Sequence, residues 1–376
     1  MKILFWVGYY KNKWGPNSKN IAGSEIAAIK IAENLKLFGH EVVVSGDVLN
    51  IHKNGVVWCG LENIHNDHFN TFDIIVGLNY AHVAKEFEQY DCEKVIWAHN
   101  TEIYHWWRGE DMPEYGDILD WRQDHIRRII CLTHWHGKHL IDYHSWHADR
   151  ISLIGNGIDK NDFIGNPVKK PNSFIWSSAV DRGLEDLLKN WHKIKSVLPD
   201  ASLNVFFPEY SYHVAPDLTN KLINSKEELL KADINIVGPV DQESLHDAML
   251  RSEFWCYLTD YEETYCITAL EMQYAGVMPI VTKVAGLQES VATGIMLENN
   301  ETKWDILVKT LGELSPSLKK FSQKKGRQWA GRQTWYERAF QWNLLLTHLV
   351  NNEDEEDPYK DNAWKKWGKV AQQHAP

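Results

Sequence analysis

Five histidines fall within residues 134–147, HWHGKHLIDYHSWH, and make this stretch a first candidate for a metal site. Two histidines bind one metal from a helix most readily when they stand four residues apart. No pair in this stretch has that spacing, and neither an HExxH motif nor a cysteine pair accompanies it. Zinc needs three or four converging ligands. We therefore expect no metal and look for the chemistry elsewhere.

A second candidate is the segment YEETYCITALEMQYAGVMPIV, residues 261–281, in which Glu263 and Glu271 flank the expected start of a helix. Glu271 shares a face with the apolar residues of this helix, where a carboxylate is costly unless it is paired or hydrogen-bonded. A helix N-terminus binds phosphate through its backbone N–H groups. Here these are the groups of Tyr265, Cys266 and Ile267. The pattern predicts a phosphate site between two acids, although Glu263 as a helix cap and Glu271 as the partner of a buried arginine remain the structural alternative.

Both candidates lie in a chain whose apolar strands alternate with amphipathic helical segments. Continuous apolar segments such as 2–9, 73–78 and 278–282 are typical of parallel sheets covered on both faces. The segment 164–173 breaks the pattern and reads as a linker. We predict an α/β protein with two doubly wound, Rossmann-like domains and a ligand cleft between them. The predicted bounds are 1–165, 166–335, and a helical segment and tail at 336–376 that can return to the first domain.

The composition excludes several classes of protein. The 376 residues carry a formal net charge of -11, which argues against binding to nucleic acid or to an anionic membrane. No GxGxxG follows the first strand and no P-loop motif occurs, so no nicotinamide cofactor is expected. No apolar run suggests a transmembrane segment or a signal peptide. With five irregularly spaced cysteines, these features indicate the cytoplasm.

The segment ETYCITALE from Glu263 to Glu271, followed by AGVMPIV, resembles the E-x7-E element of the retaining nucleotide-sugar glycosyltransferases of glycosyltransferase family 4, which have the GT-B fold. The resemblance runs over most of the chain and rests on four further segments. They are AGSE at 22–25, WAHN at 97–100, ISLIGNGID at 151–159 and SSAVDRGLEDLL at 177–188. The last one resembles the subgroup with an RGL element. The resemblance implies that the first domain binds the acceptor and the second the donor.

The resemblance also implies roles for individual residues. His99 would face the donor sugar, Glu263 would hold its hydroxyls, and Arg182 would neutralise charge on the departing diphosphate. Glu271 would hold the ribose. The diphosphate would be cradled by backbone amides, namely those of Gly23, Tyr265, Cys266 and Ile267. The expected donor is a UDP or GDP sugar, and no cofactor or metal ion is implied.

Two departures from the family pattern stand out. Many members carry a second basic residue shortly before this arginine, where this chain has Ser177, Ser178 and Ala179. Ala22 replaces the first glycine of the loop before the first helix. Three residues are weaker candidates for the acceptor side: Trp106, Trp107 and His134. The two tryptophans could stack on an acceptor sugar or simply fill the core.

The expected activity is a retaining, metal-independent transfer of a hexose-like sugar to a hydroxyl, with a glycan or another hydroxyl compound as acceptor, in glycan or polysaccharide synthesis. Two alternatives stay open. A sugar-nucleotide epimerase with the GT-B fold would act on the donor alone. A non-catalytic carbohydrate-binding protein is suggested by the missing second base.

Overall fold

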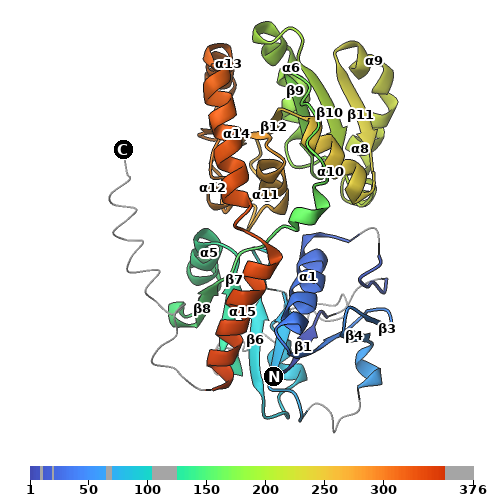
Figure 1. Ribbon diagram of the computed structural model, residues 1–376, viewed down its shortest axis with the longest axis vertical. Helices are drawn as coiled ribbons and strands as arrows, with labels where there is room; N and C mark the ends of the chain where they lie inside the picture. Colours follow the sequence, from blue (N-terminus) through green and yellow to red (C-terminus); the bar gives the residue numbers. More distant parts are fainter. Residues whose placement is uncertain (9–11, 19–20, 65–69, 104–124, 352–376) are drawn as a thin grey trace. The chain divides into compact units, whose positions relative to one another are not determined.

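The computed structural model describes residues 1–8, 12–18, 21–64, 70–103 and 125–351. The chain divides into two compact units. The first consists of Met1–Asn156 and the segment that begins at Trp335, and the second is Gly157–Thr334. Each unit is built around a sheet of parallel strands with helices beside it (Figure 1). The predicted α/β class with two Rossmann-like domains is therefore confirmed.

The sheet of the first unit has the strand order β3-β4-β2-β1-β5-β6-β7-β8, and only the β3–β4 pair is antiparallel. Its central strands are apolar and buried because helices cover the sheet. The strands are β1 (Lys2–Trp6), β2 (Glu41–Ser45), β3 (Ile51–Lys53), β4 (Val56–Cys59), β5 (Ile74–Leu78), β6 (Glu93–Trp97), β7 (Arg128–Cys131) and β8 (Ile151–Leu153). The helices are α1 (Gly23–Leu37), α3 (Val83–Glu86), α5 (His134–His144) and α15 (Trp335–Val350).

Helix α15 joins the first unit although it lies nearly two hundred residues after its strands in the sequence. It packs alongside α1 (Figure 1). The indole of Trp342 is fully buried, 4.8 Å from the ring of Trp97 and 6.0 Å from that of Phe5. His40 reaches Asn343 through its Nε2 at 2.6 Å. The helix thus completes the core beside β1 and β6.

The sheet of the second unit is entirely parallel, with the order β11-β10-β9-β12-β13-β14. Its strands are β9 (Ser173–Ser177), β10 (Ser202–Phe206), β11 (Ile234–Gly238), β12 (Phe254–Tyr257), β13 (Met278–Thr282) and β14 (Ile295–Leu297). Its helices are α6 (Leu184–Val197), α7 (Ser211–Val214), α8 (Pro216–Asn224), α9 (Lys226–Lys231), α10 (Gln242–Arg251), α11 (Ile267–Tyr274), α12 (Leu287–Ser290), α13 (Lys303–Glu313) and α14 (Pro316–Ala330). Strands β9 and β13 are buried at every position.

Strands β9 and β12 are neighbours in this sheet although about eighty residues separate them in the sequence. Because the pair is parallel, the loops after both strands leave the sheet at the same edge. The loop after β9 carries Arg182, and the loop after β12 carries Glu263. Among the described helices, none is long and apolar enough to cross a membrane.

Candidate functional site

The loops after β9 and β12 bring Arg182 and Glu263 into an ion pair. Arg182 Nη1 donates to Glu263 Oε1 at 3.0 Å, and the hydroxyl of Tyr257 donates to the same oxygen at 2.6 Å. The Glu263 side chain is about 10% exposed and that of Arg182 about 25%. The alternative that Glu263 caps the helix is not what the structure has, since no side chain caps α11.

Backbone contacts fix both halves of this pair. Gly183, directly after Arg182, has a φ of +102°, which favours glycine, and a Cβ there would stand 2.8 Å from the carbonyl oxygen of Leu258. The start of α6 can therefore approach the end of β12 closely. On the other side, the backbone N–H of Gly286 donates to the carbonyl of Glu263 at 2.8 Å. Arg182 and Glu263 are thus held by the sheet edge as well as by each other.

Two further tyrosines surround the arginine. The guanidinium of Arg182 lies 4.0 Å from the centroid of the Tyr261 ring, in cation–π geometry. Burial lowers the pKa of Arg182, but the Glu263 carboxylate and the neighbouring tyrosines together raise it by more, so the pKa lies above its ordinary value. Burial raises the pKa of Tyr210, and Arg182 opposes that shift. Arg182 therefore stays positively charged, and no described residue accepts a hydrogen bond from its Nε or Nη2.

The start of α11 lies a few residues after Glu263. Cys266 is the N-cap residue, and its side chain makes no capping hydrogen bond. Burial, followed by the Glu263 charge, raises the pKa of the Cys266 thiol well above its ordinary value, so the thiol stays neutral. The first N–H groups of a helix have no partner within it. The backbone at Cys266 and Ile267 can thus receive an anion. The Tyr265 side chain packs against the apolar cluster of Ile158, Leu270 and Ala330.

Glu271, in the middle of α11, has a different partner. His246 of α10 lies with its Nε2 3.5 Å from Glu271 Oε1. The imidazole is buried and stands 4.5 Å from the Phe163 ring. Burial lowers the pKa of His246, but its contact with Glu271 and the nearby Asp162 raise it to a value above the ordinary one. The partner is therefore a histidine and not the buried arginine of the structural alternative.

His99 belongs to the first unit and follows β6. Its backbone N–H donates to Asn79 Oδ1 at 2.6 Å, and its ring lies 4.5 Å from that of Trp97. Burial, together with the nearby His136, lowers the pKa of His99 to about 3. The imidazole is therefore neutral at physiological pH.

Within the histidine run, His136 is the buried member that contacts the WAHN segment. Thr133 caps α5 by accepting a hydrogen bond from the backbone N–H of His136 at 3.1 Å. His136 Nε2 donates to the carbonyl of Asn100 at 2.8 Å, and burial lowers the pKa of its ring to about 4. The candidate His134 is the first residue of α5 and only half-buried. Nowhere in the part of the chain that the structure describes do three or more potential metal ligands gather.

The remaining predicted residues lie elsewhere. Gly23 is the first residue of α1, exposed, after an extended Ala22 that offers no capping side chain. The hydroxyl of Ser24 donates to Glu25 at 3.0 Å within the same turn. Trp106 and Trp107 lie outside the described residues. Gly23 belongs to the first unit and the α11 amides to the second.

Sequence reasoning missed three side chains that contact the predicted residues: Tyr257, Tyr261 and His246. It also missed His136, which bonds to the carbonyl of Asn100 and lowers the pKa of His99. One signal was present for Tyr257, because its hydroxyl is the only side-chain oxygen in the strand FWCY. His246 lies on the buried face of α10, where a polar side chain needs a partner. Neither signal identifies the partner.

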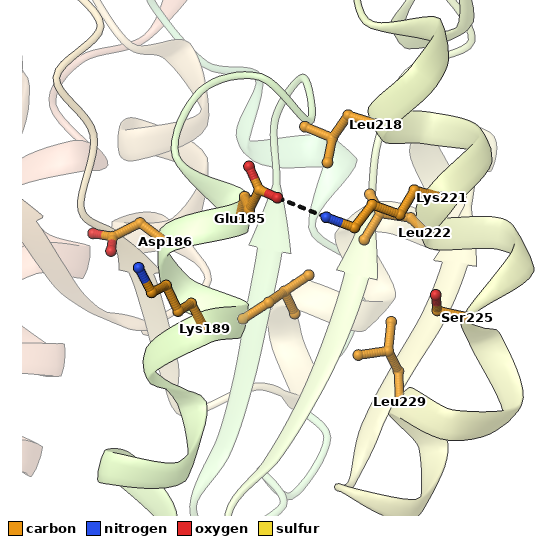
Figure 2. A pocket seen from close by; sticks show the side chains of 9 residues that line it. Glu185, Asp186, Lys189, Leu218, Lys221, Leu222, Ser225 and Leu229 are labelled. Carbon is orange, nitrogen blue, oxygen red and sulfur yellow. Dashed lines mark hydrogen bonds and ion pairs between the residues drawn. The ribbon is translucent and has the colours of Figure 1, made fainter.

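A pocket of about 680 Å³ lies apart from all these residues. Figure 2 shows it between α6, α8 and α9, with the Glu185–Lys221 ion pair of 2.9 Å across it and leucine side chains around it. None of the predicted site residues lines it. Because both ion-pair residues are more than 60% exposed, the pair is a solvated surface contact of small energetic weight.

Comparison with known proteins places the second unit in a family. Residues 158–324 match the family model described as Glycosyl transferases group 1. A comparison with curated protein sequences found no match.

Several solved structures share the fold. Sucrose-phosphate synthase from Thermosynechococcus elongatus superposes with a TM-score of 0.72 at 14% identity, over 94% of this chain and 100% of that one. A glycosyltransferase from Rickettsia africae gives 0.71 at 16% identity, over 93% and 98%. Anabaena HepE in complex with UDP-glucose gives 0.65 at 14% identity, over 92% and 99%. The second unit carries a glycosyl transferases group 1 domain, and the protein is a glycosyltransferase with the GT-B fold that moves a sugar from a nucleotide sugar.

Proposed function

We propose that the protein is a retaining glycosyltransferase of the family 4 type, in the subgroup with the RGL element, which moves a hexose-like sugar from a nucleoside diphosphate to the hydroxyl of a glycan or similar acceptor. The product belongs to glycan or polysaccharide synthesis. The five cysteines are all unpaired, which agrees with a reducing cytoplasm.

The arrangement of Arg182 and Glu263 beside the uncapped start of α11 carries the proposal. A diphosphate at the amides of Tyr265, Cys266 and Ile267 would have its charge met by the helix N-terminus. Arg182 has Nε and Nη2 left for the same diphosphate, because only Nη1 bonds to Glu263. Glu263, about 10% exposed, keeps one carboxylate oxygen for a sugar hydroxyl. One site thus offers a cation, amides and a carboxylate to the two halves of a nucleotide sugar.

In the proposed reaction the bond between the anomeric carbon and the diphosphate oxygen breaks as the acceptor oxygen bonds to that carbon on the same face. The departing phosphate oxygen takes the acceptor proton, so the products are a glycoside and a nucleoside diphosphate. Negative charge grows on the diphosphate as the bond breaks, where Arg182 and the α11 amides would stabilise it. The protein then needs no general base, and no metal ion enters any step.

His99 and Glu271 complete the proposed donor site. His99 is neutral because its pKa is lowered to about 3, so it would act on the donor sugar as a hydrogen-bonding group and not as an acid. Glu271, whose side chain is about 19% exposed, would accept hydrogen bonds from the two ribose hydroxyls, while its Oε1 keeps the contact with His246. Gly23 at the start of α1 would add an amide for the diphosphate.

The identity of the donor nucleotide is proposed from one solved structure with the same fold. HepE, with which this chain shares the fold, was solved with UDP and with UDP-glucose. We therefore place UDP-hexoses first among the candidate donors and GDP-hexoses second. The acceptor is proposed only as a hydroxyl compound; His134, Trp106 and Trp107 remain its weaker candidate contacts.

Thermal-shift measurements with UDP, GDP and ADP sugars test the proposal. A ligand that binds the folded protein stabilises it by RT ln(1 + [L]/Kd), about 2.7 kcal/mol at a concentration of 100 Kd. We expect a UDP- or GDP-hexose to raise the melting temperature and then to be consumed only with an acceptor. The anomeric configuration of the glycoside, read by NMR, should match that of the donor.

Three controls separate the alternatives. Incubation of the donor alone tests for an epimerised sugar, and EDTA tests the metal-independent chemistry. An inverted anomeric configuration would contradict the retaining mechanism. If a donor bound but was never turned over, the alternative of a non-catalytic carbohydrate-binding protein would be favoured.

A further inference from the structure

We infer that Tyr257 is a positioning residue for Glu263: its hydroxyl holds Oε1 of the carboxylate, so that Oε2 faces the donor sugar. The inference rests on the proposed function, because it concerns the carboxylate that would bind the sugar hydroxyls. It adds a residue that neither the sequence pattern nor the family match assigns.

The two strongest contacts of Glu263 fall on one oxygen. Tyr257 donates to Oε1 at 2.6 Å and Arg182 donates to it at 3.0 Å. No described residue donates to Oε2. A short hydrogen bond from a hydroxyl to a carboxylate is among the stronger kinds in proteins. Two donors on Oε1 fix the torsion of the carboxylate and leave Oε2 as the acceptor that a sugar hydroxyl can use.

Tyr257 can hold this position because its ring is buried and packed against other aromatic rings. The side chain is fully buried at the end of β12, stacked on Trp255 with ring centroids 5.1 Å apart and beside Trp176 at 5.3 Å. The Ser178 hydroxyl lies 3.4 Å from the Tyr257 hydroxyl. Burial and then the Glu263 charge raise the pKa of Tyr257, so the phenol keeps the proton that it donates.

Arg182 alone would not fix the carboxylate in the same way. Its side chain is about 25% exposed, stacks on Tyr261 and, in the proposed reaction, turns its other N–H groups to the diphosphate. A donor that shifts with the leaving group gives Glu263 a variable partner. The buried phenol of Tyr257 is the partner that stays in place, and it is therefore the residue that orients the Glu263 carboxylate.

The variant Tyr257→Phe tests this because it removes the hydroxyl and keeps the ring packing. We expect kcat to fall by roughly tenfold to a hundredfold, the scale of a hydrogen bond to a charged group. The Kd of the nucleoside diphosphate should change by less than about twofold, since Glu263 would touch only the sugar. Tyr274→Phe is the matched control: it removes a partly buried tyrosine hydroxyl of the same unit, for which the structure has ring contacts only, and it should leave kcat unchanged.

A double-mutant cycle decides whether Tyr257 acts through Glu263. In the Glu263→Gln background, Tyr257→Phe should lower kcat by much less than it does in the wild type, because the oriented carboxylate is already absent. Effects that multiply independently would overturn the inference, as would an unchanged kcat in Tyr257→Phe or an equal loss of nucleoside diphosphate binding. If the wild-type protein turned over no nucleotide sugar at all, the proposed function would fail instead, which is a different result from an active enzyme that tolerates Tyr257→Phe.

Discussion

Glu263 and Glu271 stand at the two ends of one nine-residue segment, yet the structure surrounds them differently. Glu263 lies before α11, buried, with two donors on one oxygen, one of them a permanently charged guanidinium. Glu271 lies within α11, more exposed, with one long contact of 3.5 Å to a histidine that titrates. The cationic partner of the first carboxylate stays charged throughout the physiological pH range, whereas the partner of the second titrates.

The difference fits the two tasks proposed for the acids. A group that must stabilise a transition state gains from preorganisation, because a carboxylate that is already oriented does not reorganise during the reaction. A group that binds the ribose in ground state and transition state alike only needs to be charged and accessible. Rigid surroundings at Glu263 and looser ones at Glu271 are what this division requires.

The largest expected effect comes from Glu263→Gln. The amide keeps the shape but loses the charge, and it leaves Arg182 without its anionic partner. We expect single-turnover rates to fall by about a hundredfold or more, as for other contacts made in the transition state. Calorimetry should give a nearly unchanged Kd for the nucleoside diphosphate. A parallel loss of diphosphate affinity would remove the contrast with Glu271.

The next effect in size comes from Glu271→Gln. If Glu271 holds the ribose by charge-assisted hydrogen bonds, each worth about 1.5–3 kcal/mol, nucleoside diphosphate and intact donor should both bind roughly tenfold to a hundredfold more weakly. The rate at saturating donor should change little, because uniform binding does not alter kcat. Normal diphosphate binding together with a melting temperature several degrees lower would make Glu271 a structural partner of His246 instead.

How far the sequence could predict the fold depends on how local the signal is. The buried strands MPIVT and SFIWS are continuous apolar runs between helical patterns, so the parallel sheets followed from periodicity alone. The hairpin of β3 and β4 was not predicted, although Asn54 and Gly55 form its turn with φ values of +52° and +79°. Asn-Gly is the favoured pair for such a turn, so its signal was present but the strands were too short to stand out.

The candidate site was less predictable because its contacts join distant parts of the chain. Arg182 and Glu263 are 81 residues apart and meet only because β9 and β12 are neighbours out of sequence order. The Tyr257 hydroxyl lies in an otherwise apolar strand, where a phenol reads like any other buried ring. Spacing within α11 predicts its amides and Glu271, but it says nothing about His246 on another helix.

The smallest expected effect is a pH dependence at the Glu271 end. Glu271 and Asp162 raise the pKa of His246 in the folded protein above its ordinary value of about 6.5. Because the folded state holds that proton more tightly, the stabilisation is fully present below about pH 6.5 and is lost as the pH rises through the folded pKa. We expect the wild type to lose about 0.5–1.5 kcal/mol between pH 6 and 8, the net scale of one hydrogen bond.

Comparison with two variants isolates that contribution from the general response to pH. In Glu271→Gln the carboxylate no longer raises the pKa of His246, so the stability difference between wild type and variant should be larger at pH 6 than at pH 8. In Glu263→Gln the difference should be the same at both values, since Arg182 stays charged throughout. Melting temperatures at the two pH values measure this, at roughly 2–4 °C per kcal/mol for a domain of this size. If the stability difference between wild type and Glu271→Gln were also the same at pH 6 and pH 8, the His246 contact would contribute nothing to stability. The surroundings of the two carboxylates would then differ in burial but not in their response to pH.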